Sequence, residues 1–135
     1  MVEFQIFSKT KIYNDLQWDE IIPSYYNDDF YSETWTKPER LPSVCNKDFQ
    51  VINVLGLKFG KYEFDYDNEH SKWGVAQKKN ISCFGDLNRT ESQKSRGGLV
   101  ICFENTLLAR TIRAAIVYSE ECPAKKLRFL SGESS

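Results

Sequence analysis

The chain has 135 residues, 41% of them hydrophobic and 14% aromatic, which is typical of one globular domain and excludes a disordered chain. Its 18 basic and 19 acidic residues give a net charge of −1, so it lacks the basic excess with which non-specific DNA-binding proteins neutralise phosphates. No apolar run is long enough to span a bilayer. Contact with a nucleic acid would therefore require a local basic patch or acid pH.

The first half of the chain predicts one helix followed by strands. Apolar residues recur at helical spacing over residues 14–26, and Pro23 marks the last turn of this helix or a break in it. Residues 29–36 are rich in aromatic and β-branched side chains and predict a strand. A buried strand is expected at residues 49–59, and a half-exposed strand at residues 61–66.

The second half predicts short strands, a polar loop and a helix. The strands are expected at residues 73–76, 81–84 and 99–103, and the polar loop at residues 85–96. A helix should begin at residues 104–106 and end before Pro123. This order of elements indicates a mixed α/β (α+β) fold, with one domain over residues 1–124 and a flexible tail over residues 125–135.

The four cysteines fit no zinc-binding pattern, and the single histidine cannot complete one, so we expect no metal site. Four cysteines allow three disulfide connectivities, and they can equally be buried thiols. Two sequons, which begin at Asn80 and Asn88, are glycosylation candidates. Together these features favour a secretory, oxidising environment. The first residues nevertheless lack the basic and apolar regions of a signal peptide.

The only histidine, His70, lies two residues before Lys72. In an extended segment, residues i and i+2 project from the same face, so both side chains would point into one site. Such a pair suits phosphoryl chemistry, because an imidazole can attack phosphorus or protonate a leaving oxygen while an ammonium stabilises the non-bridging oxygens. Taken alone, however, a histidine in a charged loop is more often a surface residue.

The polar loop that follows carries further groups suited to a phosphate. Asn88 could donate its amide N–H to a phosphate oxygen, and Arg89 or Arg96 could clamp a phosphate bidentately. Asp86 adds a carboxylate, and the glycines at 97–98 permit close approach of backbone to a ligand. The alternative interpretation is a solvated hairpin connection.

Three strings in this region together resemble the C-terminal half of the deoxyribonuclease II family. They are His-Ser-Lys-Trp at 70–73, Cys-Phe-Gly-Asp-Leu-Asn-Arg at 83–89, and Arg-Gly-Gly at 96–98 followed by Cys102. Upstream, Glu-Thr-Trp at 33–35 also resembles the family's approach to the site. The resemblance covers roughly residues 10–123, and the order and spacings of the strings agree with those of the family.

The resemblance implies an acid endodeoxyribonuclease of the phospholipase D type, which needs no metal or other cofactor. Such enzymes hydrolyse DNA to 3′-phosphate products at one site built from two histidine-x-lysine motifs. One histidine becomes phosphorylated, and the other acts as general acid and base. His70 and Lys72 match the second motif, so His70 takes the acid/base role. Lys72 and Asn88 would bind the scissile phosphate, and Asp86 would orient its neighbours.

The resemblance also implies a phospholipase D-like sheet flanked by helices, one half of the usual two-motif unit, in a lysosomal or secreted protein. It implies the nested disulfides that we favour, Cys83–Cys102 inside Cys45–Cys122. Leu99 departs from the family pattern, since it replaces a third glycine.

A larger departure is the absence of the first histidine-x-lysine motif, because His70 is the only histidine. We therefore expect either a homodimer or a missing N-terminal half to complete the site on a DNA substrate. An alternative is an inactive secreted relative that binds DNA or a protein partner through Arg89 and Arg96. A third possibility is a folded remnant without activity.

Overall fold

The computed structural model describes residues 3–35, 39–65 and 70–123. In chain order the elements are β1 (Phe4–Lys9), α1 (Ile21–Tyr26), β2 (Phe30–Glu33), β3 (Val51–Phe59), β4 (Tyr62–Asp65), β5 (Trp73–Ala76), β6 (Ile81–Gly85), the 3₁₀ helix η1 (Glu91–Ser95), β7 (Gly98–Glu104), α2 (Thr106–Ala115) and β8 (Ile116–Ser119). The eight strands form one sheet in the order β1-β7-β6-β5-β2-β3-β4, with β8 paired to β3. Only β2 and β3 run parallel among these pairs. This mixed sheet with two α-helices confirms the predicted α/β (α+β) class.

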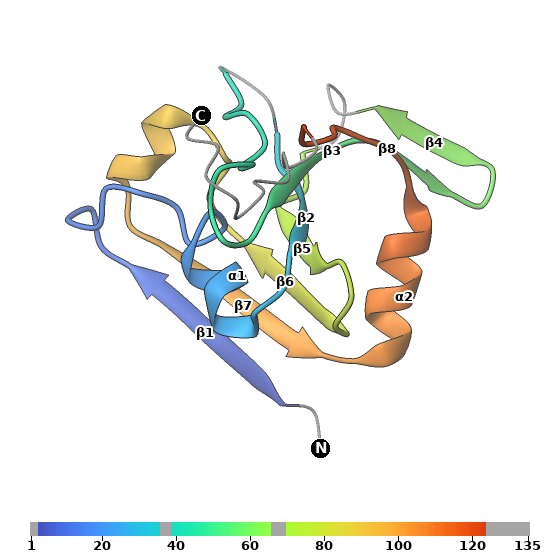
Figure 1. The fold of residues 1–135 in the computed structure, drawn as a ribbon, viewed down its shortest axis with the longest axis horizontal. Coiled ribbons are helices and arrows are strands. Elements are labelled where there is room, and N and C mark those ends of the chain that lie inside the picture. Colours follow the sequence, from blue (N-terminus) through green and yellow to red (C-terminus); the bar gives the residue numbers. More distant parts are fainter. Residues whose placement is uncertain (1–2, 36–38, 66–69, 124–135) are drawn as a thin grey trace, which may run out of the picture.

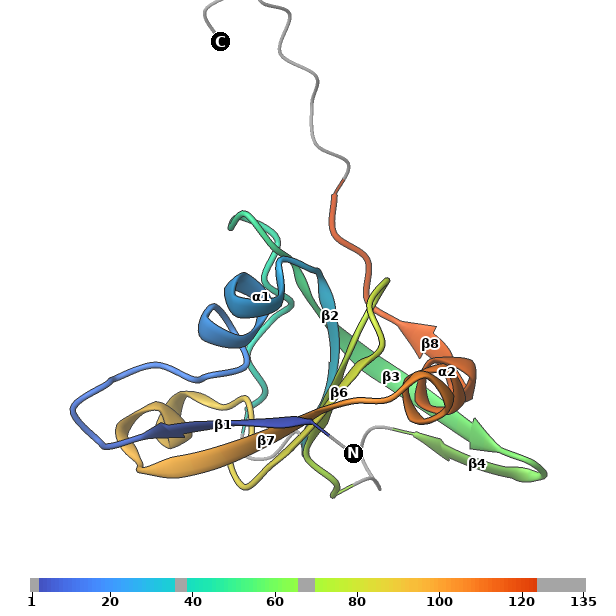
Figure 2. The same ribbon diagram turned by 90° about the horizontal axis from the view of Figure 1, so that it is seen from below.

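The sheet separates two hydrophobic cores, with α1 and α2 on opposite sides of its central strands (Figure 2). The first core lies between the sheet and the segment that runs through α1. It contains Leu16, Trp18, Ile22, Phe30, Ala76, Ile81, Cys83, Leu87, Val100 and Cys102. The second core lies under α2 and contains Val54, Leu57, Trp73, Val75, Ala109, Ile112 and Ala115. Alternate residues of β5 therefore serve different cores, as the period of a strand requires.

The C-terminal helix begins where the sequence predicts. Asn105 is its N-cap, and the Asn105 side chain accepts a hydrogen bond of 2.9 Å from the backbone N–H of Leu108. Ala109, Ile112 and Ala115 are buried at helical spacing and face the second core. The chain then passes directly from α2 into β8 (Figure 1).

The predicted helix over residues 14–26 is wrong in extent. Only Ile21–Tyr26 is helical, and the turns before it bury Leu16 and Trp18 instead. Pro23 lies in the first turn of α1, where its missing N–H would have no partner within the helix, and not in the last turn. Two strands, β1 and β8, were not expected from the sequence. The predicted tail at residues 125–135 lies outside the described residues.

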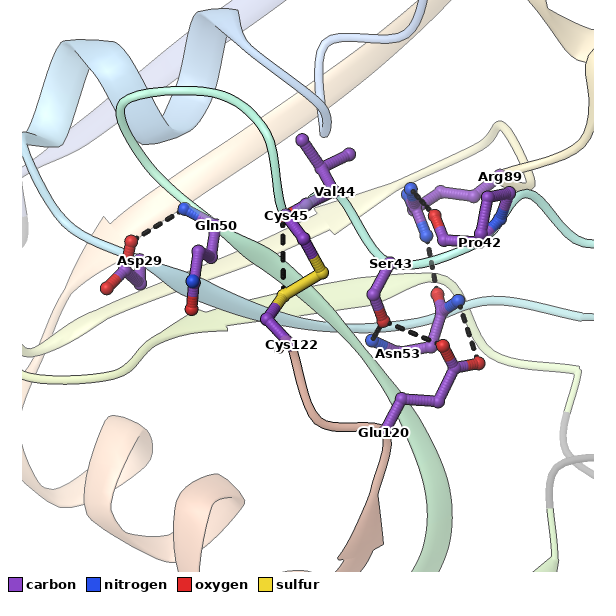
Figure 3. The surroundings of a disulfide bond; sticks show 10 residues. All are labelled: Asp29, Pro42, Ser43, Val44, Cys45, Gln50, Asn53, Arg89, Glu120 and Cys122. Atoms are coloured by element: carbon purple, nitrogen blue, oxygen red, sulfur yellow. Dashed lines mark hydrogen bonds between the residues drawn. A yellow bond between two sulfur atoms is a disulfide. The ribbon is translucent and has the colours of Figure 1, made fainter. Parts of the chain in front are cut away.

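Both predicted disulfides are present. Cys83–Cys102 joins facing residues of β6 and β7, and both of its cysteines are buried in the first core. Cys45–Cys122 joins the loop before β3 to the segment after β8 (Figure 3). The nested pairing is therefore confirmed. Within the described ranges, no helix has the length and apolar character needed to cross a membrane.

Candidate active site

Several strand ends meet at one edge of the sheet and bring the predicted site segments together. Strand β5 pairs with β2 on one side, where Trp73 faces Glu33, and with β6 on the other, where Trp73 faces Phe84. The N–H of Gly85 also donates to the backbone oxygen of Lys72 over 3.0 Å. The residues just before β5 therefore lie beside the loop that follows β6, as the resemblance implies.

His70 and Lys72 lie at this edge, in the segment that enters β5. The His70 side chain is exposed, and its ring stacks on the indole of Trp35 with 4.3 Å between ring centroids and 23° between planes. Lys72 is half-buried, and its Nζ donates to the backbone oxygen of His70 over 3.3 Å. The Lys72 ammonium thus contacts the backbone of His70 within the same short segment.

Asn88 is tied to the same edge through Trp35. Its Oδ1 accepts a hydrogen bond of 3.1 Å from the backbone N–H of Trp35. Since Oδ1 is the acceptor, the two Nδ2 donors point away from this bond and are suited to a phosphate oxygen. The structure therefore brings His70 and Asn88 to one residue, Trp35, whose role sequence reasoning missed. Its only signal was the Glu-Thr-Trp string at 33–35.

Asp86 holds the connection between β6 and β7. Its Oδ1 accepts a hydrogen bond of 2.9 Å from the N–H of Leu99. A Cβ on Gly98 would lie 2.5 Å from Cδ1 of Leu87 and 2.7 Å from Oδ1 of Asp86, so a larger residue here would force these side chains to shift. Gly98 thus leaves room for the side chains of Leu87 and Asp86 and not for a ligand. The hydrogen bond from Leu99 to Asp86 suits a role for Asp86 in orienting its neighbours.

Arg89 is not available to a phosphate, which corrects the expectation for this residue. Its side chain is 0% exposed, and its Nε lies 2.6 Å from Oδ1 of Asp19. The remaining guanidinium nitrogens donate to Asn53 Oδ1 and to the backbone oxygen of Pro42 (Figure 3). This buried guanidinium joins the loop after β6 to three other segments. It is a structural group, because its donors are already used inside the protein.

Arg96 is exposed and follows η1 at the far end of the loop. In the described part of the chain, no hydrogen bond or ion pair joins its side chain to His70, Lys72 or Asn88. The same loop is held to β1 by the buried Lys9, whose Nζ donates to the backbone oxygen of Lys94 over 2.7 Å. Burial lowers the pKa of the Lys9 ammonium, partly offset by the charge of Asp15.

The two sequons have different surroundings. Asn80 lies in the turn between β5 and β6, where its side chain bonds to Thr106 and Arg113. Asn88 lies in the candidate site, and the sequon residue Thr90 is only 1% exposed. The third residue of the Asn80 sequon is buried to the same degree, since Ser82 is also 1% exposed.

The electrostatics of the site come from the protein's own cations and amides. Within residues 3–35, 39–65 and 70–123, no group of three or more histidine, cysteine, aspartate or glutamate side chains could hold a metal ion. The arrangement offers an imidazole, an ammonium group and an amide within one sheet edge. Such a set can bind a phosphate and transfer a proton to or from it.

Comparison with known proteins places these features in a family. The deoxyribonuclease II family model matches residues 1–122. The chain is 35% identical to human deoxyribonuclease-2-beta over 96 residues, which are 67% of this chain and 27% of that protein. It is 29% identical to plancitoxin-1 of Acanthaster planci over 123 residues, which are 88% of this chain and 34% of that protein. It is also 30% identical to deoxyribonuclease-2 of Caenorhabditis elegans over 108 residues, which are 78% of this chain and 29% of that protein.

The chain therefore spans about a third of the length of these curated relatives. The match nevertheless includes every residue of the candidate site, since the family model extends from residue 1 to residue 122. On this basis, the chain belongs to the deoxyribonuclease II family.

Proposed function

We propose that this chain supplies half of an acid endodeoxyribonuclease site that hydrolyses DNA phosphodiesters to 3′-phosphate products. The observation that carries the proposal is the meeting of His70, Lys72 and Asn88 at one sheet edge around Trp35. Membership of a nuclease family agrees with it. His70 acts as general acid and base, and the chemistry runs through a phosphohistidine.

In the first step, a nitrogen of a second histidine attacks the phosphorus while the bond to the 5′-oxygen breaks. The His70 imidazolium gives its proton to that leaving oxygen. In the second step, the neutral His70 takes a proton from water, whose oxygen attacks the phosphohistidine and releases the 3′-phosphate. Lys72 and the Nδ2 donors of Asn88 bind the non-bridging oxygens, where negative charge develops.

The second histidine must come from outside this chain, because His70 is its only one. We propose that a second copy supplies it, so that the working unit is a homodimer. An N-terminal half of a longer protein is the other possible source, since the relatives are about three times as long. An exposed apolar face on β1, β7 and α2 supports association, because exposed apolar surface of this kind marks protein contacts.

We also propose a lysosomal or secreted location. Two disulfides are typical of proteins that fold in an oxidising compartment. A glycan on Asn80, detected as a mass loss on deglycosylation of the protein expressed in a secretory pathway, would support this location. Recovery of the protein with four reduced cysteines from its native source would contradict it.

The experiment is a plasmid-nicking assay at roughly pH 5 in the presence of a chelator. The expected result is nicked DNA whose 3′ ends become substrates for a DNA polymerase only after phosphatase treatment. Ends that a polymerase extends directly would contradict the 3′-phosphate mechanism. Cleavage that requires added metal would contradict the proposed chemistry.

The second candidate function is DNA binding without cleavage by an inactive relative. The exposed Arg96 on the loop after η1 favours it, whereas the buried Arg89 cannot contribute. Binding of this kind should weaken steeply as salt is raised, with log affinity falling linearly against log salt. An Arg96→Ala variant that reduces this slope, in a protein that cleaves nothing, would identify this function.

A further inference from the structure

The contacts of Trp35 suggest a role in the site beyond filling space. The indole lies face to face with the His70 ring, with 4.3 Å between centroids. Within the described residues, neither ring nitrogen of His70 forms a hydrogen bond, so the stack is the contact that orients the ring there. This arrangement suits an acid/base histidine, because a ring held by its face keeps both nitrogens available for proton transfer.

Trp35 is itself held in place by the residues that precede it in the chain. It follows the buried end of β2, where Ser32, Glu33 and Thr34 are all 2% exposed or less. Thr34 Oγ1 accepts a hydrogen bond of 3.0 Å from the backbone N–H of Arg89, whose guanidinium is anchored in the interior. The indole therefore projects from rigid backbone toward the more exposed segment that carries His70.

The backbone of Trp35 orients the second polar group of the site. Its N–H donates to Asn88 Oδ1 over 3.1 Å, which fixes the amide with its donors directed away from Trp35. The indole and the backbone N–H of one residue thus contact both His70 and Asn88. Among the described residues, Trp35 alone contacts both of these side chains.

We propose that Trp35 is the positioning residue of this site: it holds the His70 imidazole by its face and sets the orientation of the Asn88 amide. The consequence for catalysis rests on the proposed nuclease function, whereas the structural part can be tested without any activity. Loss of the stack should lower kcat by on the order of 10- to 100-fold with little change in KM, because misplacement of a reacting group affects the chemical step.

The structural test uses proton NMR of the single histidine, whose ring signals can be assigned without ambiguity. Stacking on an indole should shift the His70 ring protons upfield of their positions in the urea-unfolded chain. Trp35→Leu should abolish this shift, and Trp35→Phe should keep part of it. The matched control is Tyr25→Leu, which removes a ring of α1 that packs on Phe7 of β1. It should leave the His70 signals unchanged.

Two Asn88 variants separate orientation from phosphate binding. Asn88→Asp keeps an acceptor for the Trp35 N–H but loses both donors, so the His70 shift should persist while cleavage is lost. Asn88→Ala loses the acceptor as well, so the upfield shift should decrease.

The outcomes are distinct for the two proposals. If the His70 ring protons of the folded wild-type protein have the same chemical shifts as in the unfolded chain, the role of Trp35 is overturned, whether or not the protein cleaves DNA. If the wild-type protein cleaves DNA, a folded Trp35→Phe variant that cleaves no better than a folded Trp35→Leu variant would also overturn this role. If Trp35→Leu does not fold, the role of Trp35 is tested by the upfield shift of the His70 ring protons in the wild-type protein and in Trp35→Phe. An upfield shift in a protein that cleaves nothing would support the positioning contact and contradict the nuclease function instead.

Discussion

At the scale of single residues, Arg89 shows how a group suited to a ligand can serve the fold. A guanidinium has five N–H donors, and inside a protein each needs an acceptor. Four of the donors of Arg89 find acceptors on Asp19, Asn53, Leu41 and Pro42, in segments that are distant in sequence. The loop that carries Asn88 is consequently anchored immediately after that residue.

Replacement of this guanidinium should destabilise the protein strongly. Arg89→Met leaves the 6% exposed Asp19 without its partner, and breaking a buried pair in this way costs about 3–5 kcal/mol. Urea unfolding with the disulfides intact measures the change in free energy of unfolding. The control is Lys47→Met, which breaks the exposed pair with Glu20 and should cost less than about 1 kcal/mol. Equal effects of the two variants would contradict the role assigned to Arg89.

The family resemblance predicted that His70, Lys72 and Asn88 belong to one site. The structure brings their segments together because strands β5 and β6 are adjacent in the chain and pair locally. The sequence could not identify Trp35 or the burial of Arg89. Trp35 reaches Asn88 across 53 positions of the sequence, and Arg89 reaches Asp19 across 70. Such contacts depend on the strand order of the sheet, which local patterns do not specify.

At the scale of elements, the sequence predicted most of the central strands and the start of α2, because their apolar runs are continuous. It missed β1 and β8. Strand β1 has two exposed aromatic or aliphatic residues, Phe4 and Ile6, and forms only by pairing with β7. The apolar residues near Leu16 recur at helical spacing, but they lie in turns and pack into the first core. In these places tertiary contacts override local propensity.

The first helix carries a pH-sensitive contribution to stability. Burial, with smaller effects from Tyr25 and Glu104, raises the pKa of Tyr26 from 10.0 to about 12. The neutral phenol is therefore favoured in the folded state. Its contribution is fully present below the ordinary pKa and is lost as the pH rises through the folded value.

Stability against urea should accordingly fall between about pH 10 and about pH 12, and Tyr26→Phe should reduce that fall. Phenylalanine keeps the ring contacts with Phe7 and Phe30 but cannot ionise. Tyr118→Phe, at a ring that is 63% exposed, is the matched control and should retain the wild-type pH dependence. A fall of wild-type size in Tyr26→Phe would contradict this assignment.

At the scale of the whole molecule, one face of the sheet beside α2 remains open. Phe4 faces Phe103 across the β1–β7 pair, and Phe4 is 56% exposed. On α2, Leu107 is 77% exposed. A groove of about 460 Å³ runs between the sheet and the helix, and its lining residues are Phe84, Phe103, Asn105, Leu107, Leu108 and Thr111. None of these residues is charged, so the groove suits an apolar partner surface.

If this face joins two copies, charges placed on it should produce monomers. Phe4→Lys combined with Leu107→Lys changes two exposed side chains, so the fold should be retained. Sedimentation velocity should show a dimer for the wild-type protein and a monomer for the double variant. Ile12→Lys, at an 87% exposed position in the loop after β1, is the control and should stay dimeric. A wild-type protein that sediments as a monomer would contradict the proposed homodimer.

In the proposed function, His70 performs the acid/base chemistry of DNA cleavage. The most direct test is plasmid nicking at roughly pH 5 in chelator by His70→Asn. The control is Lys58→Ala, at an exposed residue near the end of β3. His70→Asn should lose at least about 100-fold in nicking rate, while Lys58→Ala should cleave at the wild-type rate. Cleavage by His70→Asn at the rate of the wild-type protein would contradict this role of His70.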